Sequence, residues 1–72
     1  MKHQTTELSR AAATELRAHI ARLDLPERAA AELIGVDPTW LNRRLHGRGN
    51  ITLDDIELIC SKLHIPVSEV IR

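Results

Sequence analysis

The chain has 72 residues, of which ten are basic and ten are acidic, so its formal net charge at neutral pH is zero. A chain of this length forms one small domain with a single core, and we expect residues 1–72 to be that domain, with 1–5 flexible. The neutral charge gives no general attraction to nucleic acid, and the single cysteine excludes an internal disulfide. No apolar run is long enough to cross a bilayer and no signal peptide is evident, so we expect a cytoplasmic protein without membrane contact.

The first periodic segment predicts a helix over about residues 6–23. Thr6 is a suitable N-cap, and Glu7 is well placed for the helix dipole. Apolar residues then recur at steps of four and three, which predicts that one face of this helix enters the core: Leu8, Ala12, Leu16, Ile20 and Leu23. Pro26 breaks the pattern and starts a second helix that extends to about residue 33.

Residues 35–47 combine a turn with one helix of about ten residues. Gly35 can adopt a positive φ, which lets the chain reverse. Asp37 is a suitable N-cap, and Pro38 then occupies the first helical position, where its missing N–H is harmless. Gly47 ends the helix. The segment therefore carries helix signals at both ends.

The two sides of this short helix differ in chemistry. Leu41 and Leu45 share an apolar stripe, whereas the opposite side presents side chains that hydrogen-bond: Thr39, Asn42, Arg43 and His46. Such a row suits the major groove of DNA, where each base pair presents donors and acceptors. On periodicity alone, the solvated face of an ordinary helical bundle is the more frequent explanation.

Two further helices are predicted downstream. Thr52 caps the fourth helix, with Asp55 three residues on as an acidic form of the capping box. The core-facing residues of this helix are Ile56, Ile59, Cys60 and Leu63. A last short helix starts at Pro66 and extends to about residue 71. Its apolar residues exceed what a short helix needs, so we expect part of the group to lie at a two-fold contact: Val67, Val70 and Ile71.

Part of this spacing resembles the phage-repressor and Cro type of helix-turn-helix, also called the xenobiotic-response-element type. The residues that carry the resemblance are Ala31, Gly35, Val36, Leu41 and Gly47. Residues 52–71 resemble the last two helices of the same family. The resemblance implies an all-α, five-helix domain whose recognition helix, residues 37–46, lies in the major groove. It further implies a small transcriptional regulator, phage or prophage encoded, that binds double-stranded DNA as a homodimer.

The resemblance divides the polar residues into two groups. The base-reading candidates are Thr39, Asn42 and Arg43. The backbone candidates are Arg28, Trp40, His46, Arg48 and Asn50. We expect Trp40 to be partly buried with its polar edge wet. Arg44 should lie along its helix, with a head group that can pair with an acid of the fourth helix or with a phosphate.

Three positions depart from the family pattern. Many relatives have a glutamine at the position of Glu27, where it binds a backbone phosphate. A carboxylate cannot donate to a phosphate and repels it, although Arg28 can replace that contact. Many relatives also have a buried arginine–glutamate pair where this chain has Ile20 and Leu45. We expect these two apolar side chains to touch in the core, because packed apolar residues often replace a buried ion pair without loss of stability.

A second function stays open beside DNA binding. The same fold can serve as a protein-interaction module that binds a phage or host regulatory partner and no DNA. The neutral charge, Glu27 and the net acidic residues 49–72 favour this alternative, whereas Arg43 and Arg44, with Arg48 near, favour DNA.

Other chemistry has little support in the sequence. Cys60 and His64 are four residues apart, but they supply only half of a zinc site and no second close pair exists. No phosphate loop, dinucleotide fingerprint or activated serine motif is present. We therefore expect no metal, no cofactor and no enzymatic activity, and a nucleoid-associated location in the cytoplasm.

Overall fold

A computed structural model describes residues 7–47 and 49–71, which form four α-helices and no strand. The helices are α1 (Glu7–Arg22), α2 (Glu27–Ile34), α3 (Pro38–Leu45) and α4 (Leu53–Leu63), followed by a single 3-10 turn, η1 (Val67–Glu69). The predicted N-cap Thr6 and the segment 1–5 lie outside the described residues. Within them, no helix is long and apolar enough to cross a membrane.

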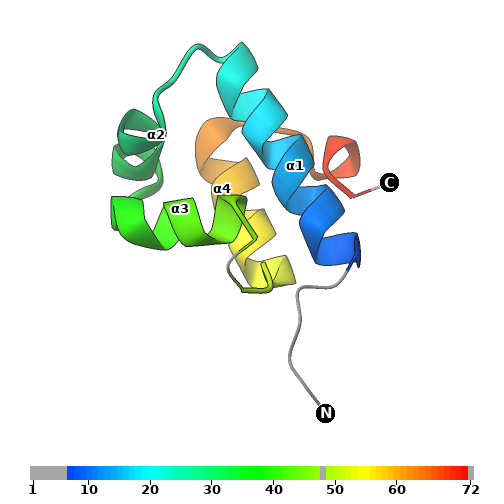
Figure 1. Cartoon of the computed structure of the whole chain (residues 1–72). Helices are drawn as coiled ribbons and strands as arrows, with labels where there is room; N and C mark the ends of the chain where they lie inside the picture. The colour runs from blue at the N-terminus through cyan, green and yellow to red at the C-terminus, as the bar shows by residue number, and fades with distance from the viewer. Residues whose placement is uncertain (1–6, 48, 72) are drawn as a thin grey trace.

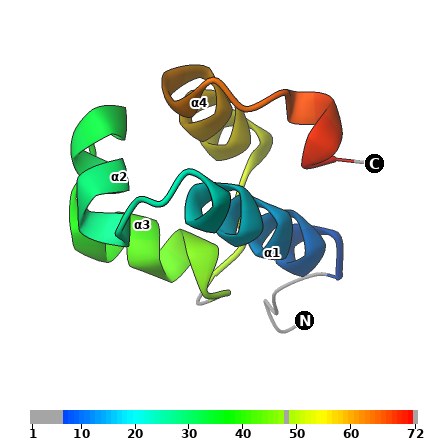
Figure 2. The same cartoon turned by 90° about the horizontal axis from the view of Figure 1, so that it is seen from above.

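The helices surround one core. Figure 1 shows α2 and α3 together at one side of the molecule, and Figure 2 shows α1 and α4 on opposite sides of the core. The largest fully buried side chains come from α1, α3 and α4: Leu16, Leu41, Leu45, Ile59 and Cys60. Ala30 and Ala31 are also fully buried, where α2 packs against both α3 and α4. Their small side chains let the three helices approach closely.

The predicted fifth α-helix is wrong. Residues 66–71 contain only the turn η1, in which the Val70 amide donates to the Val67 carbonyl at 2.9 Å. The segment is too short to offset the cost of starting an α-helix, and β-branched valine and isoleucine side chains favour one less than Leu or Ala. Val70 nevertheless closes the core, whereas Val67 stays 44% exposed.

The buried face of α1 differs in part from the predicted one. Ala12, Leu16 and Ile20 are buried as predicted, but Leu8 is 71% exposed and Leu23 is 47% exposed. Each four-residue step overshoots a full turn of an α-helix by about 40°. Leu8 is two such steps before Leu16, so it is turned away from the core-facing side of α1. Leu23 follows the last residue of α1. The core instead receives the small side chains Ser9 and Ala13.

The predicted start signals of α3 and α4 are confirmed. The Asp37 carboxylate accepts from the Thr39 amide at 2.7 Å, and Pro38 is the first residue of α3. Thr52 and Asp55 form the complete capping box of α4. Each side chain of this pair accepts from the other residue's amide at 3.0 Å.

The turn into α3 and the end of α3 are set by glycines. Gly35 follows α2 with φ 88°, as predicted for a reversal of the chain. α3 is shorter than the predicted helix over residues 37–46. It ends at Leu45, two residues before Gly47. Gly47 has φ 73°, and a helix leaves its regular dihedrals before a left-handed residue of this kind. His46 therefore lies just beyond α3.

Candidate nucleic-acid interface

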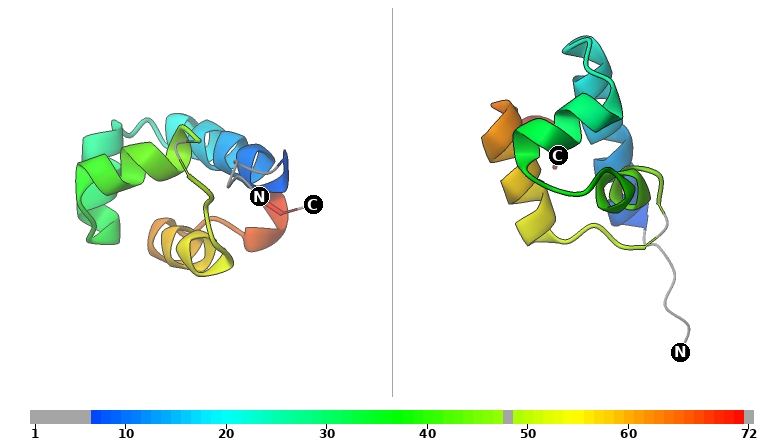
Figure 3. Two further views of the ribbon diagram at one scale, coloured as in Figure 1. Left: turned by 60° about the horizontal axis from the view of Figure 1, so that its bottom comes forward. Right: turned by 90° about the vertical axis from the view of Figure 1, so that its left-hand side faces the viewer.

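The outward side of α3 carries the predicted base-reading residues. Leu41 and Leu45 hold the helix on the core. On the other side the exposed residues are Thr39, Asn42 and Arg43, with His46 just past the helix end. In the left view of Figure 3, which brings the bottom of Figure 1 forward, α3 lies in front of α2. The structure therefore brings these four polar residues together on one exposed face.

The neighbours Arg43 and Arg44 have opposite environments. The Arg44 Nε donates to Asp55 Oδ2 at 2.9 Å, and its guanidinium carbon lies 4.9 Å from the centre of the Trp40 ring. Arg43 is exposed and makes no hydrogen bond or ion pair with any described residue. Of the two arginines, Arg43 therefore keeps its planar fork of donors available for a ligand.

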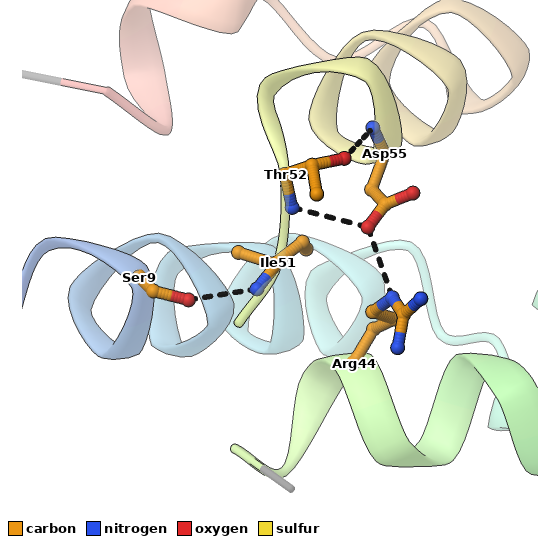
Figure 4. A network of polar contacts seen from close by, with 5 residues as sticks. All are labelled: Ser9, Arg44, Ile51, Thr52 and Asp55. Carbon is orange, nitrogen blue, oxygen red and sulfur yellow. Dashed lines mark hydrogen bonds and ion pairs between the residues drawn. The ribbon is translucent and has the colours of Figure 1, made fainter. Parts of the chain in front are cut away.

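Arg44 belongs to a polar network that fixes the start of α4 (Figure 4). Asp55 accepts from Arg44 on α3 and from the Thr52 amide. On the other side of the same segment, the buried Ser9 hydroxyl of α1 accepts from the Ile51 amide at 2.8 Å. Sequence reasoning missed Ser9, although its place on the buried side of α1 follows from the helical period.

Trp40 supports this network from the core side. It is half-buried and packs against the hydrophobic core, which confirms the expected partial burial. A guanidinium over an indole face is attracted by the ring's quadrupole. Trp40 and Asp55 together hold Arg44 in place, so a phosphate has to compete with both of them for this side chain.

Glu27 reaches the outward side of α3, a contact that sequence reasoning also missed. Its Oε1 accepts from Asn42 Nδ2 at 3.2 Å, and its Oε2 lies 2.8 Å from His46 Nε2. A signal was present in the sequence, because Asn42 and His46 are four residues apart and share one helix side. One carboxylate thus contacts a predicted base reader and a predicted backbone residue at once.

Arg17 holds the carboxyl end of α3. Its Nη1 donates to the carbonyl of Leu45, the last residue of that helix. Carbonyls at a helix end lack partners within the helix, and a cation there is favourable to the dipole. Arg17 therefore anchors α3 beside Ile20 and Leu45, which both lie in the core cluster.

The other backbone candidates come from outside residues 38–45. Arg28 on α2 and Asn50 before α4 are exposed, whereas Arg48 lies outside the described residues. Cys60 is buried, and burial raises the pKa of its thiol, while His64 is exposed beyond the end of α4. Across residues 7–47 and 49–71, no three histidine, cysteine, aspartate or glutamate side chains gather in a way that could hold a metal ion.

No protein-family model matches the sequence, and no curated protein matches it significantly. Two solved structures are similar over most of their length. The clp gene regulator ClgR from C. glutamicum is 26% identical, with a TM-score of 0.80 over 96% of this chain and 88% of that one. The hypothetical transcription factor NHTF from Neisseria is 19% identical, with a TM-score of 0.81 over 100% of this chain and 85% of that one. The chain shares its fold with transcription regulators.

These comparisons support a helix-turn-helix regulator in general. Both similar proteins are regulators by name, and neither name describes an enzyme. Neither name mentions a phage repressor or a Cro protein, so the narrower family and the phage origin stay predictions.

Proposed function

We propose that this protein is a sequence-specific transcription regulator that binds double-stranded DNA with α3 in the major groove. The observation that carries the proposal is the environment of Arg43. This arginine is exposed on a helix that buried leucines hold in place, while the adjacent Arg44 is already paired with Asp55. The shared fold with transcription regulators supports the same function.

The proposed contacts divide into two kinds. Arg43 reads a base, because an arginine fork matches the two acceptors on the major-groove edge of guanine. Thr39 and Asn42 flank it on the same face and modulate base preference. The residues proposed to position the protein on phosphates carry no sequence information themselves: Arg28, Trp40, His46, Arg48 and Asn50.

We propose further that two copies bind together. A groove of about 490 Å³ lies between the first turns of α1, the start of α4 and the end of the chain. Leu8 and Leu53 line it and are 71% and 72% exposed. One copy thus offers both an apolar groove and protruding leucines, as a self-complementary two-fold contact requires. A second copy also supplies the second recognition helix that an operator of two half-sites needs.

Binding to a protein partner is the second candidate. The Glu27 carboxylate lies on the outward side of α3, where it repels phosphate, and the chain has no net positive charge. Both features are compatible with a regulatory protein as the ligand of this face.

Selection from random duplexes at low salt tests the proposal. The purified protein is incubated with a random-sequence library, and bound duplexes are amplified and sequenced over several rounds. DNA binding predicts enrichment of a short motif, repeated with two-fold symmetry if two copies bind. If no duplex is enriched, the DNA proposal is wrong and the protein-partner candidate replaces it.

A further inference from the structure

The contact between Glu27 and Asn42 limits how Asn42 can meet a ligand. An ionised carboxylate accepts hydrogen bonds and cannot donate them. The Asn42 atom that faces Glu27, at 3.2 Å, is therefore its amino nitrogen and not its oxygen. The chemistry of the partner thus fixes the assignment of the amide, which is otherwise ambiguous for asparagine.

This orientation has a consequence for the exposed side of α3. The Asn42 Oδ1 only accepts hydrogen bonds, so the ionised carboxylate of Glu27 cannot engage it. Whichever hydrogen of Nδ2 bonds the carboxylate, Oδ1 stays an acceptor on an exposed residue. An outward acceptor pairs with base edges that carry an amino group, namely adenine N6 or cytosine N4. On guanine, which presents O6 and N7, and on thymine, which presents O4, Oδ1 finds no donor, and only the remaining hydrogen of Nδ2 can bond there.

His46 anchors the carboxylate from its other side. The Glu27 Oε2 lies 2.8 Å from His46 Nε2, and because the carboxylate only accepts, Nε2 must carry a proton. The two oxygens of Glu27 are thus engaged by different residues, which prevents the carboxylate from turning away from Asn42. Both side chains of the pair stay partly exposed, at 43% for His46 and 34% for Glu27.

We propose that Glu27 is a positioning residue that sets the base preference of Asn42. It holds the amide so that Asn42 selects a base with an amino group, adenine or cytosine, at the position it meets. This inference rests on the proposed DNA binding. It also explains what an acid contributes on a face that approaches phosphates: Glu27 lowers the affinity for every duplex and raises the discrimination at one base.

The test substitution is Glu27→Gln, which keeps the length of the side chain and removes its charge. A glutamine offers both a donor and an acceptor, so it no longer dictates which amide atom of Asn42 turns outward. Glu32→Gln is the matched control. Glu32 is exposed on the same helix, and the charge change is identical. Among the described residues, Glu32 makes no hydrogen bond or ion pair with α3.

The wild type and both variants are compared by random-duplex selection and by competition binding to duplexes that differ at single positions. Glu27→Gln is expected to lower the preference for adenine or cytosine at one position by about two- to tenfold, the worth of one hydrogen bond. Its affinity for random duplexes should rise, because a negative charge is lost. A merely damaged fold would lower the affinity instead. Glu32→Gln should leave the preference unchanged.

Two further variants assign the effect to Asn42. Asn42→Ala should lose the same preference, and adding Glu27→Gln to it should change that position no further. The side-chain amide resonances of Asn42 in the free protein provide an independent readout, and they should shift in Glu27→Gln and stay in place in Glu32→Gln.

The possible failures are distinguishable. If the wild type selects a motif and Glu27→Gln retains every base preference, the inference is wrong while DNA binding stands. Asn42 amide resonances that respond equally to both glutamine substitutions also overturn it, because the contact is then absent in solution. If the wild type enriches no duplex, the proposed function and the inference fall together.

Discussion

Leu45 occupies the centre of the core on the inner side of α3 and is fully buried. Leu45→Ala leaves a cavity there and is expected to lower the free energy of unfolding by about 2–5 kcal/mol. Leu45→Glu should cost more, because a carboxylate enters an apolar site and Ile20 offers it no opposite charge. Urea denaturation followed by circular dichroism measures both. A smaller loss for Leu45→Glu would show that the new carboxylate reaches Arg17, contrary to this expectation.

The contact expected between Ile20 and Leu45 stays a prediction at the level of the pair. Both residues are in the core cluster, and α1 packs against α3. A double-mutant cycle with Ile20→Val and Leu45→Ala should give a coupling energy above about 0.5 kcal/mol if the side chains touch. If the losses of stability from the two substitutions simply add, the side chains of Ile20 and Leu45 do not touch.

Cys60 is expected to make the folded protein less stable at alkaline pH. Burial raises the pKa of its thiol above the usual 9.0, so the native state binds the thiol proton more tightly than the unfolded chain does. The resulting stability is complete below the unfolded pKa and is lost as the pH rises through the folded pKa. Cys60→Ala should lack this loss. The unfolding free energies of the wild type and Cys60→Ala should therefore converge as the pH rises from neutral to about pH 10. Parallel curves would contradict the raised pKa of the Cys60 thiol.

At the scale of elements, the capping box of α4 is the most local source of stability. Thr52→Ala removes the acceptor for the Asp55 amide and should cost about 1 kcal/mol. Thr52→Ser keeps the hydroxyl and serves as the control. Asp55→Ala should cost more than Thr52→Ala, because Asp55 also accepts from Arg44 on α3. Thermal denaturation of the three variants checks this order. Equal losses of stability for both alanine variants would show that the hydrogen bond from Arg44 to Asp55 adds no stability.

Sequence predicted the elements where the signals are local. Asp37 and Thr52 cap their helices through atoms two or three residues away, so the amino-acid order alone locates the starts of α3 and α4. The contacts of Ser9 with Ile51 and of Arg17 with Leu45 join segments far apart in the sequence. They depend on how helices cross, which hydrophobic periodicity does not provide.

The same reason explains the missed part of the candidate site. The outward row of α3 follows from helical periodicity, and the structure exposes Thr39, Asn42 and Arg43 as that pattern predicts. The position of Glu27 against this row depends on the packing of α2 on α3. Sequence therefore anticipated that Glu27 would disturb a phosphate contact but not that it would bind Asn42.

At the scale of the whole molecule, the groove beside Leu53 determines the expected assembly. Leu53→Asp places a charge on this exposed rim and should convert a dimer to a monomer without change in helix content. Leu33→Asp, on an exposed site of α2 outside the groove lining, is the matched control and should stay dimeric. Val70 is unsuitable for this test, because it is buried in its own chain. Sedimentation at micromolar concentration decides, and a monomeric wild type would contradict the two-copy proposal.

The zero net charge makes the few phosphate contacts important for binding. With little non-specific attraction to replace a lost contact, affinity should fall quickly as salt rises above the physiological range. Arg28→Ala, and equally Arg48→Ala, should weaken binding to all duplexes alike and lower the salt slope by about one unit.

The most direct test compares Arg43→Ala with Arg28→Ala in competition between the selected duplex and random DNA, with Arg22→Ala as a charge-matched control. Arg22 is exposed and is the last residue of α1, and Figure 1 shows that this end of α1 lies at the top of the view, above α3. We expect Arg43→Ala to lose about 1–3 kcal/mol of discrimination while its binding to random DNA changes far less. Arg28→Ala should keep the discrimination, and Arg22→Ala should behave as the wild type. If Arg43→Ala discriminates between the two duplexes as well as the wild type does, α3 does not read DNA through Arg43 and the central claim is wrong.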